Sequence, residues 1–151
     1  MLTKTPSGLR EIIQVFGSID DPKFEAKNIV LFSLPYPLIY DGKEVTRARC
    51  HRKLVENFQA AFETIKKLGL QDQCKRYGGI YNKRSIRGFA SHASTHCWGI
   101  APDLEPRLYP LGSRKRFPEP IIKAFTDVGF FYGGDFKGRK DPMHFQFATK
   151  Y

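Results

Sequence analysis

The longest hydrophobic pattern in the chain has helical spacing and lies between about residues 49 and 68. Apolar side chains recur there every three or four positions, at Leu54, Val55, Phe58, Ala61, Phe62, Ile65 and Leu68. This periodicity predicts an amphipathic helix that ends at Gly69 and packs its apolar face behind a sheet.

The same spacing predicts two shorter helices nearer the ends of the chain. The first follows Ser7, a residue type that caps helices, and ends at Gly17. The second opens at Pro118, which suits a first helical turn, and ends at Gly129. Their apolar positions are Leu9, Ile12, Ile13 and Phe16 in the first helix, and Ile121, Ile122, Phe125 and Val128 in the second.

Short apolar runs between the helices predict strands at residues 28–34, 77–81 and 99–104. The first run is expected to end at Pro35 and Pro37, because proline lacks the backbone donor that a sheet uses. Short strands combined with separate helices, without regular alternation, indicate an α+β fold with a small antiparallel sheet packed against helices.

Strand geometry groups small and acidic side chains within residues 99–104. If this segment is extended, Gly99, Ala101 and Asp103 share one face, and the two small residues leave space above the strand. His96 precedes Gly99, where the chain can bend and bring the imidazole back toward the carboxylate.

A second alternating segment lies near the other end of the chain. From His144 onward, His144, Gln146 and Ala148 fall on one face, whereas Phe145 and Phe147 fall on the other. This pattern is typical of a half-buried strand whose aromatic face enters the core.

These two segments contain two imidazoles and two carboxylates, from His96, Asp103, Asp141 and His144. That set matches a catalytic zinc site with three protein ligands and a separate base. Asp141 and His144 are three residues apart, so they can border one cavity. By spacing alone, either could bind the metal while the other transfers protons.

Other arrangements of the same residue types are weaker. His92 and His96 have the spacing of a helical metal pair, but Ala93 replaces the glutamate of an HExxH motif. Cys97 follows His96 directly, and neighbours in sequence point in different directions, so a small buried residue is expected rather than a thiol nucleophile. His51 is expected to face solvent from a helix.

The spaced motif resembles that of the zinc D-alanyl-D-alanine carboxypeptidase and L-alanyl-D-glutamate endopeptidase family, which includes phage endolysins. The resemblance lies in Ser94-x-His96-x-x-Gly99-x-Ala101-x-Asp103 and in Asp141-x-x-His144-Phe145. Residues 77–88 resemble the arginine-bearing stretch of phage-encoded members, and the amino-terminal helix has a weaker likeness. The resemblance implies a Hedgehog/DD-peptidase-like zinc peptidase fold.

Carried over by position, the resemblance implies that zinc is the cofactor and that His96, Asp103 and His144 bind it. It also implies that Asp141 is the general base of peptide hydrolysis. Pro102 departs from the family pattern, which has an aliphatic residue there. The missing backbone donor of Pro102 puts the local sheet pairing in question, but not the ligands.

The resemblance further implies that Arg84 stabilises the developing oxyanion and that Ser94 contacts the substrate. Arg87 lies three residues after Arg84, and spacing does not choose between them. We therefore predict Arg84 as a catalytic residue, with Ser94 and Arg87 as substrate-binding residues.

The chain is strongly basic, with 25 Lys and Arg against 15 Asp and Glu and a net charge of +10. Such a charge attracts polyanions, but the basic residues are scattered and no nucleic-acid-binding motif accompanies them. We expect the partners to be bacterial peptidoglycan and anionic envelope polymers rather than nucleic acid. A pure solubility role for the charge and a nucleic-acid binder remain as alternatives.

The length of 151 residues predicts a single catalytic domain, residues 1–151, without a separate wall-binding module. Three cysteines without CxxC spacing argue against a disulfide framework. No apolar run reaches the roughly 20 residues of a membrane span. The first ten residues lack the apolar core of a secretion signal. We expect a monomer made in the host cytoplasm that acts on the wall, in the periplasm, after release.

The leading hypothesis is therefore a zinc-dependent peptidoglycan peptidase that cuts an amide bond of the peptide stem, as a phage endolysin endopeptidase does. One alternative is a D,D-carboxypeptidase acting on D-Ala-D-Ala termini. Another, from a different class, is a non-catalytic binding module stabilised by zinc. Asp141 and Arg84 together favour the enzymes, because a binding module needs neither residue.

Overall fold

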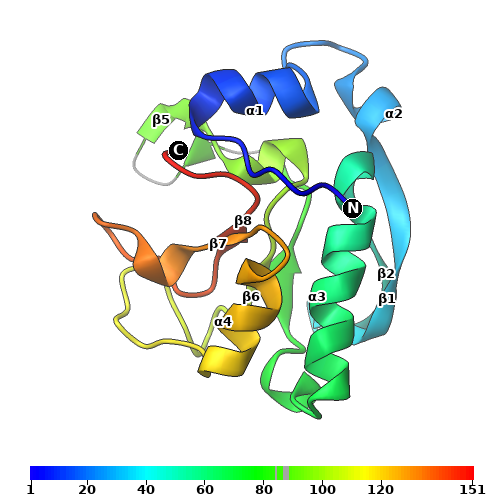
Figure 1. Ribbon diagram of the computed structural model, residues 1–151, viewed down its shortest axis with the longest axis vertical. Helices are drawn as coiled ribbons and strands as arrows, with labels where there is room; N and C mark the ends of the chain where they lie inside the picture. Colours follow the sequence, from blue (N-terminus) through cyan, green and yellow to red (C-terminus); the bar gives the residue numbers. More distant parts are fainter. Residues whose placement is uncertain (84, 87–88) are drawn as a thin grey trace.

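Helices cover a series of short antiparallel strand pairs in this chain (Figure 1). The structure is a computed structural model that describes residues 1–83, 85–86 and 89–151. Its α-helices are α1 (Gly8–Phe16), α2 (Phe24–Asn28), α3 (Val55–Lys67) and α4 (Glu119–Thr126). Its strands are β1 (Ile29–Tyr40), β2 (Lys43–His51), β3 (Tyr77–Gly79), β4 (Ser85–Ile86), β5 (Phe89–Ala93), β6 (Asp103–Leu104), β7 (Phe131–Tyr132) and β8 (Phe145–Gln146). The mixture of helices and antiparallel strands confirms the α+β class.

Within the described residues, the strands form four antiparallel pairs instead of one small sheet: β1 with β2, β3 with β6, β4 with β5, and β7 with β8. An isolated bridge between Asp103 and His144 links β6 to the chain that enters β8. Two backbone hydrogen bonds extend this link, from Phe145 N to Pro102 O at 3.1 Å and from Leu104 N to Met143 O at 2.7 Å. The missing N–H of Pro102 had put the local sheet pairing in question. The segment nevertheless pairs with the chain around His144, because the Pro102 carbonyl accepts a hydrogen bond there.

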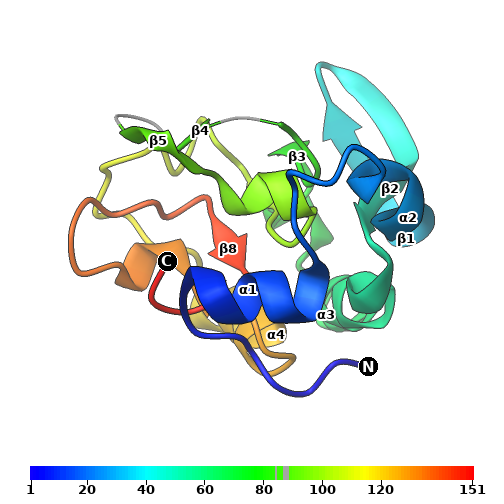
Figure 2. The ribbon, with the colours of Figure 1, turned by 90° about the horizontal axis from the view of Figure 1, so that it is seen from above.

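The first hairpin is longer than the sequence pattern predicted. Pro35 and Pro37 do not end β1, which continues to Tyr40. The strand pairing shifts register between Ser33 and Leu38, so the two prolines lie in an irregular stretch that needs no regular ladder of donors. Figure 2 shows the hairpin at the edge of the molecule, beside α2.

The main helix begins later than predicted. Residues 49–51 belong to β2, a 3-10 helix occupies Arg52–Leu54, and α3 starts at Val55. The apolar spacing identified the body of the helix, and Gly69 follows its end with a positive φ of 71°. Local spacing could not place the start, because the preceding residues pair with β1.

The two shorter helices lie where their spacing predicted, as α1 and α4. Ser7 is at the N-cap position of α1, but its side chain makes no capping hydrogen bond. Instead the Glu11 carboxylate accepts from the Ser7 backbone N–H at 2.8 Å. The predicted hydrogen bond between the Ser7 side chain and the first turn is therefore absent, and a side chain of the first turn bonds to the Ser7 backbone instead.

Aromatic side chains join the helices to the strands behind the site. Helices α3 and α4 lie side by side (Figure 1) and bring Phe62 and Phe125 into edge contact at 5.4 Å between ring centroids. Phe125 also stacks on Phe145 of β8 at 4.5 Å. Because both phenylalanines are fully buried, α4 fixes the position of the strand that follows His144.

Among the described residues, no helix combines the length and hydropathy that crossing a membrane requires. All three cysteines lie in the described part of the chain and are buried thiols. Cys97 is thus the small buried residue that was predicted.

Candidate metal centre

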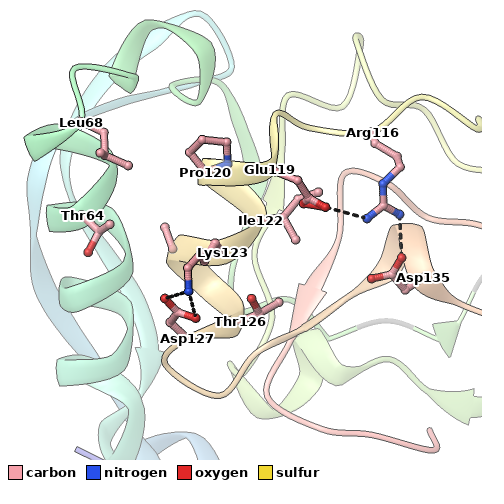
Figure 3. A pocket seen from close by; sticks show the side chains of 11 residues that line it. Thr64, Leu68, Arg116, Glu119, Pro120, Ile122, Lys123, Thr126, Asp127 and Asp135 are labelled. Atoms are coloured by element: carbon pink, nitrogen blue, oxygen red, sulfur yellow. Dashed lines mark hydrogen bonds and ion pairs between the residues drawn. The ribbon is translucent and has the colours of Figure 1, made fainter.

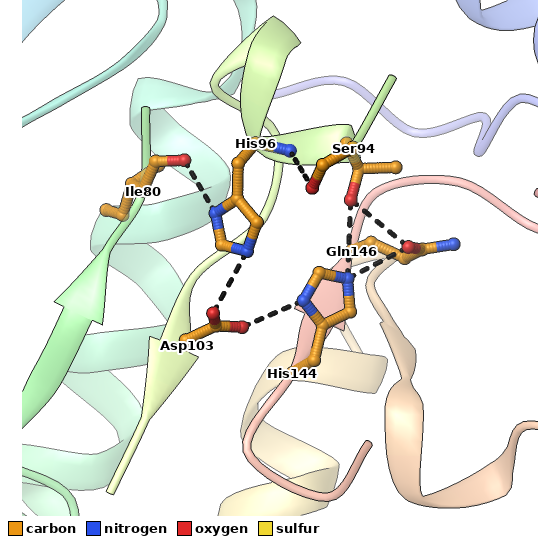
Figure 4. Close-up of polar contacts among 7 residues, drawn as sticks. Ile80, Ser94, His96, Asp103, His144 and Gln146 are labelled. Carbon is orange, nitrogen blue, oxygen red and sulfur yellow. Dashed lines mark hydrogen bonds and ion pairs between the residues drawn. The ribbon is translucent and has the colours of Figure 1, made fainter. Parts of the chain in front are cut away.

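Three predicted ligands from distant parts of the chain lie together in the structure. One ligand atom each from His96, Asp103 and His144 falls within 4.8 Å of the other two, and all three residues are buried (Figure 4). The two imidazole rings are 5.1 Å apart at their centroids, with an angle of 64° between their planes. The carboxylate lies between them, so its two oxygens face different rings.

His96 is placed by a short 3-10 helix, η3 (Thr95–Trp98), that follows β5. The Ser94 hydroxyl caps this helix by accepting from the His96 backbone N–H at 3.3 Å. The ring nitrogen Nδ1 lies 3.0 Å from the Ile80 carbonyl, which can only accept, so Nδ1 carries the proton. In the neutral ring Nε2 is then the lone-pair atom, and it lies 3.2 Å from Asp103.

Asp103 opens strand β6, opposite Gly79 of β3. Its Oδ1 is 2.9 Å from His144 Nδ1 and its Oδ2 is 3.2 Å from His96 Nε2. Burial raises the pKa of this carboxyl, but the hydrogen bonds and charges of His144 and His96 together outweigh burial and hold the pKa well below its usual range. The site therefore contains a buried, ionised carboxylate.

His144 faces Asp103 through Nδ1 and Gln146 through Nε2, which is 2.9 Å from Gln146 Oε1. Burial lowers the pKa of His144, yet the hydrogen bond and charge of Asp103, followed by the charge of Asp141, raise it overall. Negative charge that attracts a proton to Nδ1 would equally attract a metal cation in its place.

The donor set fits a divalent transition metal such as zinc. Two imidazole nitrogens and one carboxylate are the ligands of many catalytic zinc sites, where a fourth position stays open for water or substrate. Each histidine also donates its other ring N–H, one to a backbone carbonyl and one to a side-chain amide oxygen. Such outer hydrogen bonds are the usual way in which proteins orient metal-binding imidazoles.

Asp141 begins the turn that ends at His144. The Asp141 carbonyl accepts from His144 N at 3.0 Å, and the Asp141 N–H donates to Gly133 O at 3.0 Å. Its carboxylate is close enough for its charge to raise the His144 pKa, although Asp141 is not one of the three clustered ligands. Spacing alone left open which of Asp141 and His144 would face a metal, and the resemblance implied His144; the geometry brings His144 to His96 and Asp103.

The remaining predicted site residues have different outcomes. Ser94 is buried next to His96 and supports it through the cap of η3. Arg84 and Arg87 lie outside the described residues, so their roles stay predictions. Sequence reasoning gave no role to Gln146, although strand alternation had placed it on the same face as His144.

The alternatives raised by the sequence do not match the geometry. His92 is exposed on strand β5, whereas His96 is on η3, so the two do not form a helical pair. His51 is not a solvent-facing helix residue. It ends β2, is fully buried, and its Nε2 lies 3.0 Å from the Phe16 carbonyl.

A separate open groove lies between α3 and α4 (Figure 3), and none of the three clustered ligands lines it. Charged side chains along it pair with one another, as in Lys123 with Asp127 at 2.8 Å and Arg116 with Asp135 at 2.6 Å. Exposed pairs of this kind contribute little, about 0–1 kcal/mol each. The charges along the groove are therefore exposed and paired, unlike the buried carboxylate of Asp103.

The fold and the buried group together define an α+β protein with a candidate site for a catalytic metal. Residues 87–147 match the family model described as D-alanyl-D-alanine carboxypeptidase, a range that is less than half of the chain. This match supports a peptidase of that family, whose members are typically zinc-dependent, and it contains all three ligands and Asp141. Comparisons with curated proteins and with solved structures found no match.

Proposed function

We propose that this chain is a zinc-dependent peptidase that hydrolyses an amide bond in the peptide stem of bacterial peptidoglycan. The observation that carries the proposal is the buried His96, Asp103 and His144 group, because it lies within the segment that matches the carboxypeptidase family model. The same match supports a Hedgehog/DD-peptidase-like fold for the chain.

In this mechanism His96 Nε2, Asp103 and His144 Nδ1 would hold the metal. Zinc, when bound, supplies Lewis-acid chemistry and lowers the pKa of water to about 7. Asp141 takes the proton of the attacking water and passes it to the departing amine, as a general base and then a general acid. Arg84, or Arg87 in its place, stabilises the negative oxygen of the tetrahedral intermediate, and Ser94 contacts the peptide.

We further propose an endolysin-type endopeptidase that reaches the wall, in the periplasm, after its release from the cytoplasm. The net charge of +10 supports attraction to an anionic envelope. A D,D-carboxypeptidase is the second candidate, and the description of the matching family model favours it. The two candidates differ in whether the scissile bond is inside the stem or at its D-Ala-D-Ala terminus.

Digestion of purified peptidoglycan, with and without a chelator, tests the proposal. Mass spectrometry of the products would identify a free L-Ala carboxyl, a D-Ala carboxyl or released D-alanine, and each names a different bond. His144→Ala, prepared in parallel, should yield none of these products. Degradation that continues in the chelated protein, or an absence of new termini with the zinc-loaded protein, would refute the proposal.

A further inference from the structure

We propose that Gln146 is a positioning residue that makes Nδ1, rather than Nε2, the metal-binding atom of His144. The inference rests on the proposed metal site and extends it by one residue beyond the ligands. It follows from the orientation of the Gln146 amide and from the groups that surround it (Figure 4).

The orientation of the Gln146 amide is fixed by its nitrogen. Gln146 is buried, and its Nε2 donates to the Ala148 carbonyl at 3.2 Å and to the Tyr151 carbonyl at 3.4 Å. Carbonyl oxygens only accept, so the amide nitrogen must face them. The amide oxygen Oε1 is consequently directed to the opposite side, toward His144.

The amide oxygen then fixes the tautomer of the imidazole. Oε1 lies 2.9 Å from His144 Nε2 and accepts a second hydrogen bond from the Thr95 hydroxyl at 3.2 Å. An amide oxygen carries no hydrogen and can only accept, so Nε2 must be the protonated nitrogen at this 2.9 Å contact. The Thr95 hydroxyl also lies 3.3 Å from Nε2, but it donates its own hydrogen to Oε1. In the neutral ring the lone pair is therefore on Nδ1, the atom that faces Asp103.

Different acceptors thus fix opposite tautomers in the two histidines. The Ile80 carbonyl holds the proton of His96 on Nδ1, whereas Gln146 holds that of His144 on Nε2. Thr95 precedes His96 directly, so its bond to Gln146 also connects the two ligand-bearing segments. Loss of the Gln146 oxygen would let the His144 ring rotate or exchange tautomers, and its affinity for a metal would fall.

Three variants separate the acceptor role from packing. Gln146→Leu removes the oxygen and the amide nitrogen. Gln146→Glu keeps an acceptor for His144 Nε2 but loses the donors to Ala148 and Tyr151. Thr95→Val is the comparison variant: it removes the hydroxyl that lies 3.2 Å from Gln146 Oε1 and 3.3 Å from His144 Nε2, but it leaves the contact between Gln146 and His144 in place.

Zinc affinity is measured by competition with a chromophoric chelator, and the folding of each metal-free variant is measured by thermal unfolding. We expect Gln146→Leu to lose about 10- to 100-fold in zinc affinity, the usual effect of removing an outer-shell partner. Gln146→Glu should recover most of that affinity, although both variants lose thermal stability. Thr95→Val should lose less affinity than Gln146→Leu.

Unchanged zinc affinity in Gln146→Leu would overturn the inference. It would also be overturned if Gln146→Glu lost as much zinc affinity as Gln146→Leu for a similar loss of thermal stability, because the effect would then come from packing. If Gln146→Leu does not fold, nitrogen NMR of the zinc-loaded wild type decides: a proton on His144 Nε2 supports the inference and a proton on Nδ1 refutes it. A wild-type chain that binds no zinc would refute the proposed function as well. Normal zinc binding with an insensitive Gln146 would refute the inference alone.

Discussion

At the scale of single residues, the charge of Asp103 explains why the three ligands lie together. A buried carboxylate is costly unless hydrogen bonds or opposite charges compensate for the lost water. Here the two imidazoles lie 2.9 Å and 3.2 Å from its oxygens, and they provide that compensation when they are protonated; when they are neutral, a bound cation would provide it. The same arrangement leaves one ring nitrogen of each histidine directed at the carboxylate, so a cation bound there would meet all three donors.

Two substitutions distinguish metal binding from proton transfer. His144→Ala removes one of three ligands, so both bound zinc and peptidoglycan hydrolysis should be lost. Asp141→Asn keeps the turn but removes the base, so zinc should remain while turnover falls about 10²- to 10⁴-fold. Bound zinc is measured by elemental analysis after dialysis. Hydrolysis by Asp141→Asn at the wild-type rate would exclude Asp141 as the base.

The buried His51 should make the free energy of unfolding depend on pH. Burial lowers the pKa of His51 from 6.5 to about 4, and the hydrogen bond to Phe16 opposes this shift only in part. Above pH 6.5 both states are neutral, so the full stability is present. As the pH falls toward 4, the unfolded chain is protonated first, and stability should decline by about 3 kcal/mol in total.

The difference between wild type and His51→Gln isolates this effect from other titrating groups. Denaturant unfolding at a series of pH values between 4 and 7 measures it. We expect the wild type to lose more stability than the variant as the pH falls. Parallel curves for the two proteins would show that His51 is protonated equally in both states.

At the scale of elements, Gly99 connects the first hairpin to η3, the 3-10 helix that carries His96. The predicted extended face of Gly99, Ala101 and Asp103 is not formed at Gly99, which has a φ of 68° and ends η3. A Cβ atom there would lie 2.9 Å from both His51 N and Ile29 Cδ1. The open space expected above this glycine is therefore filled by β1 and β2, and the glycine permits that close approach.

Gly99→Ala should consequently destabilise the fold and weaken metal binding, because η3 carries His96. Left-handed strain and overpacking together should cost about 3 kcal/mol. Gly42→Ala is the matched control, since Gly42 has a similar φ of 75° but nothing within 4 Å of the added Cβ atom. It should cost about 1 kcal/mol. Equal losses of unfolding free energy in the two variants would contradict the packing argument.

The elements also show which structure could be predicted from sequence. Helices α1, α3 and α4 each bury apolar residues at helical spacing, although Leu9 and Ile13 of α1 are exposed, so local pattern was enough to find them. Strand β2 was missed because most of its residues are exposed and its position depends on pairing with β1. Strands as short as β6 and β8 have only two residues each, and pairing with distant segments defines them.

The same limit applies to the candidate site. Residue types and spacing indicated His96, Asp103, Asp141 and His144 as candidate donors, because a metal site needs such groups, and the family resemblance implied that His96, Asp103 and His144 are the ligands. Spacing could not say which ring nitrogen would face the carboxylate, since the Ile80 carbonyl and the Gln146 amide decide it through tertiary contacts. The candidate ligand residues could thus be predicted from the sequence, whereas the ring nitrogen that each histidine presents depends on tertiary contacts.

At the scale of the whole molecule, the excess of positive charge should affect encounter with the wall rather than the chemistry. Twenty-five basic residues against 15 acidic ones are spread over the chain, while the candidate metal group is buried. Charges exposed to solvent are screened beyond about 8 Å at physiological ionic strength, whereas buried groups are screened much less. Salt should therefore weaken the attraction to anionic polymers and leave the buried site largely unchanged.

Hydrolysis of intact walls should slow as salt increases, but hydrolysis of walls stripped of anionic polymers should not. Attraction between a basic protein and a polyanion raises the local concentration and the rate of encounter, and both fall with ionic strength. The measurement is the rate of new amino termini on both substrates at low and high salt, with a short soluble stem peptide as the control. Equal salt dependence on intact and stripped walls would mean that the charge acts on peptidoglycan itself or on the fold, and the anionic polymers would then not be partners.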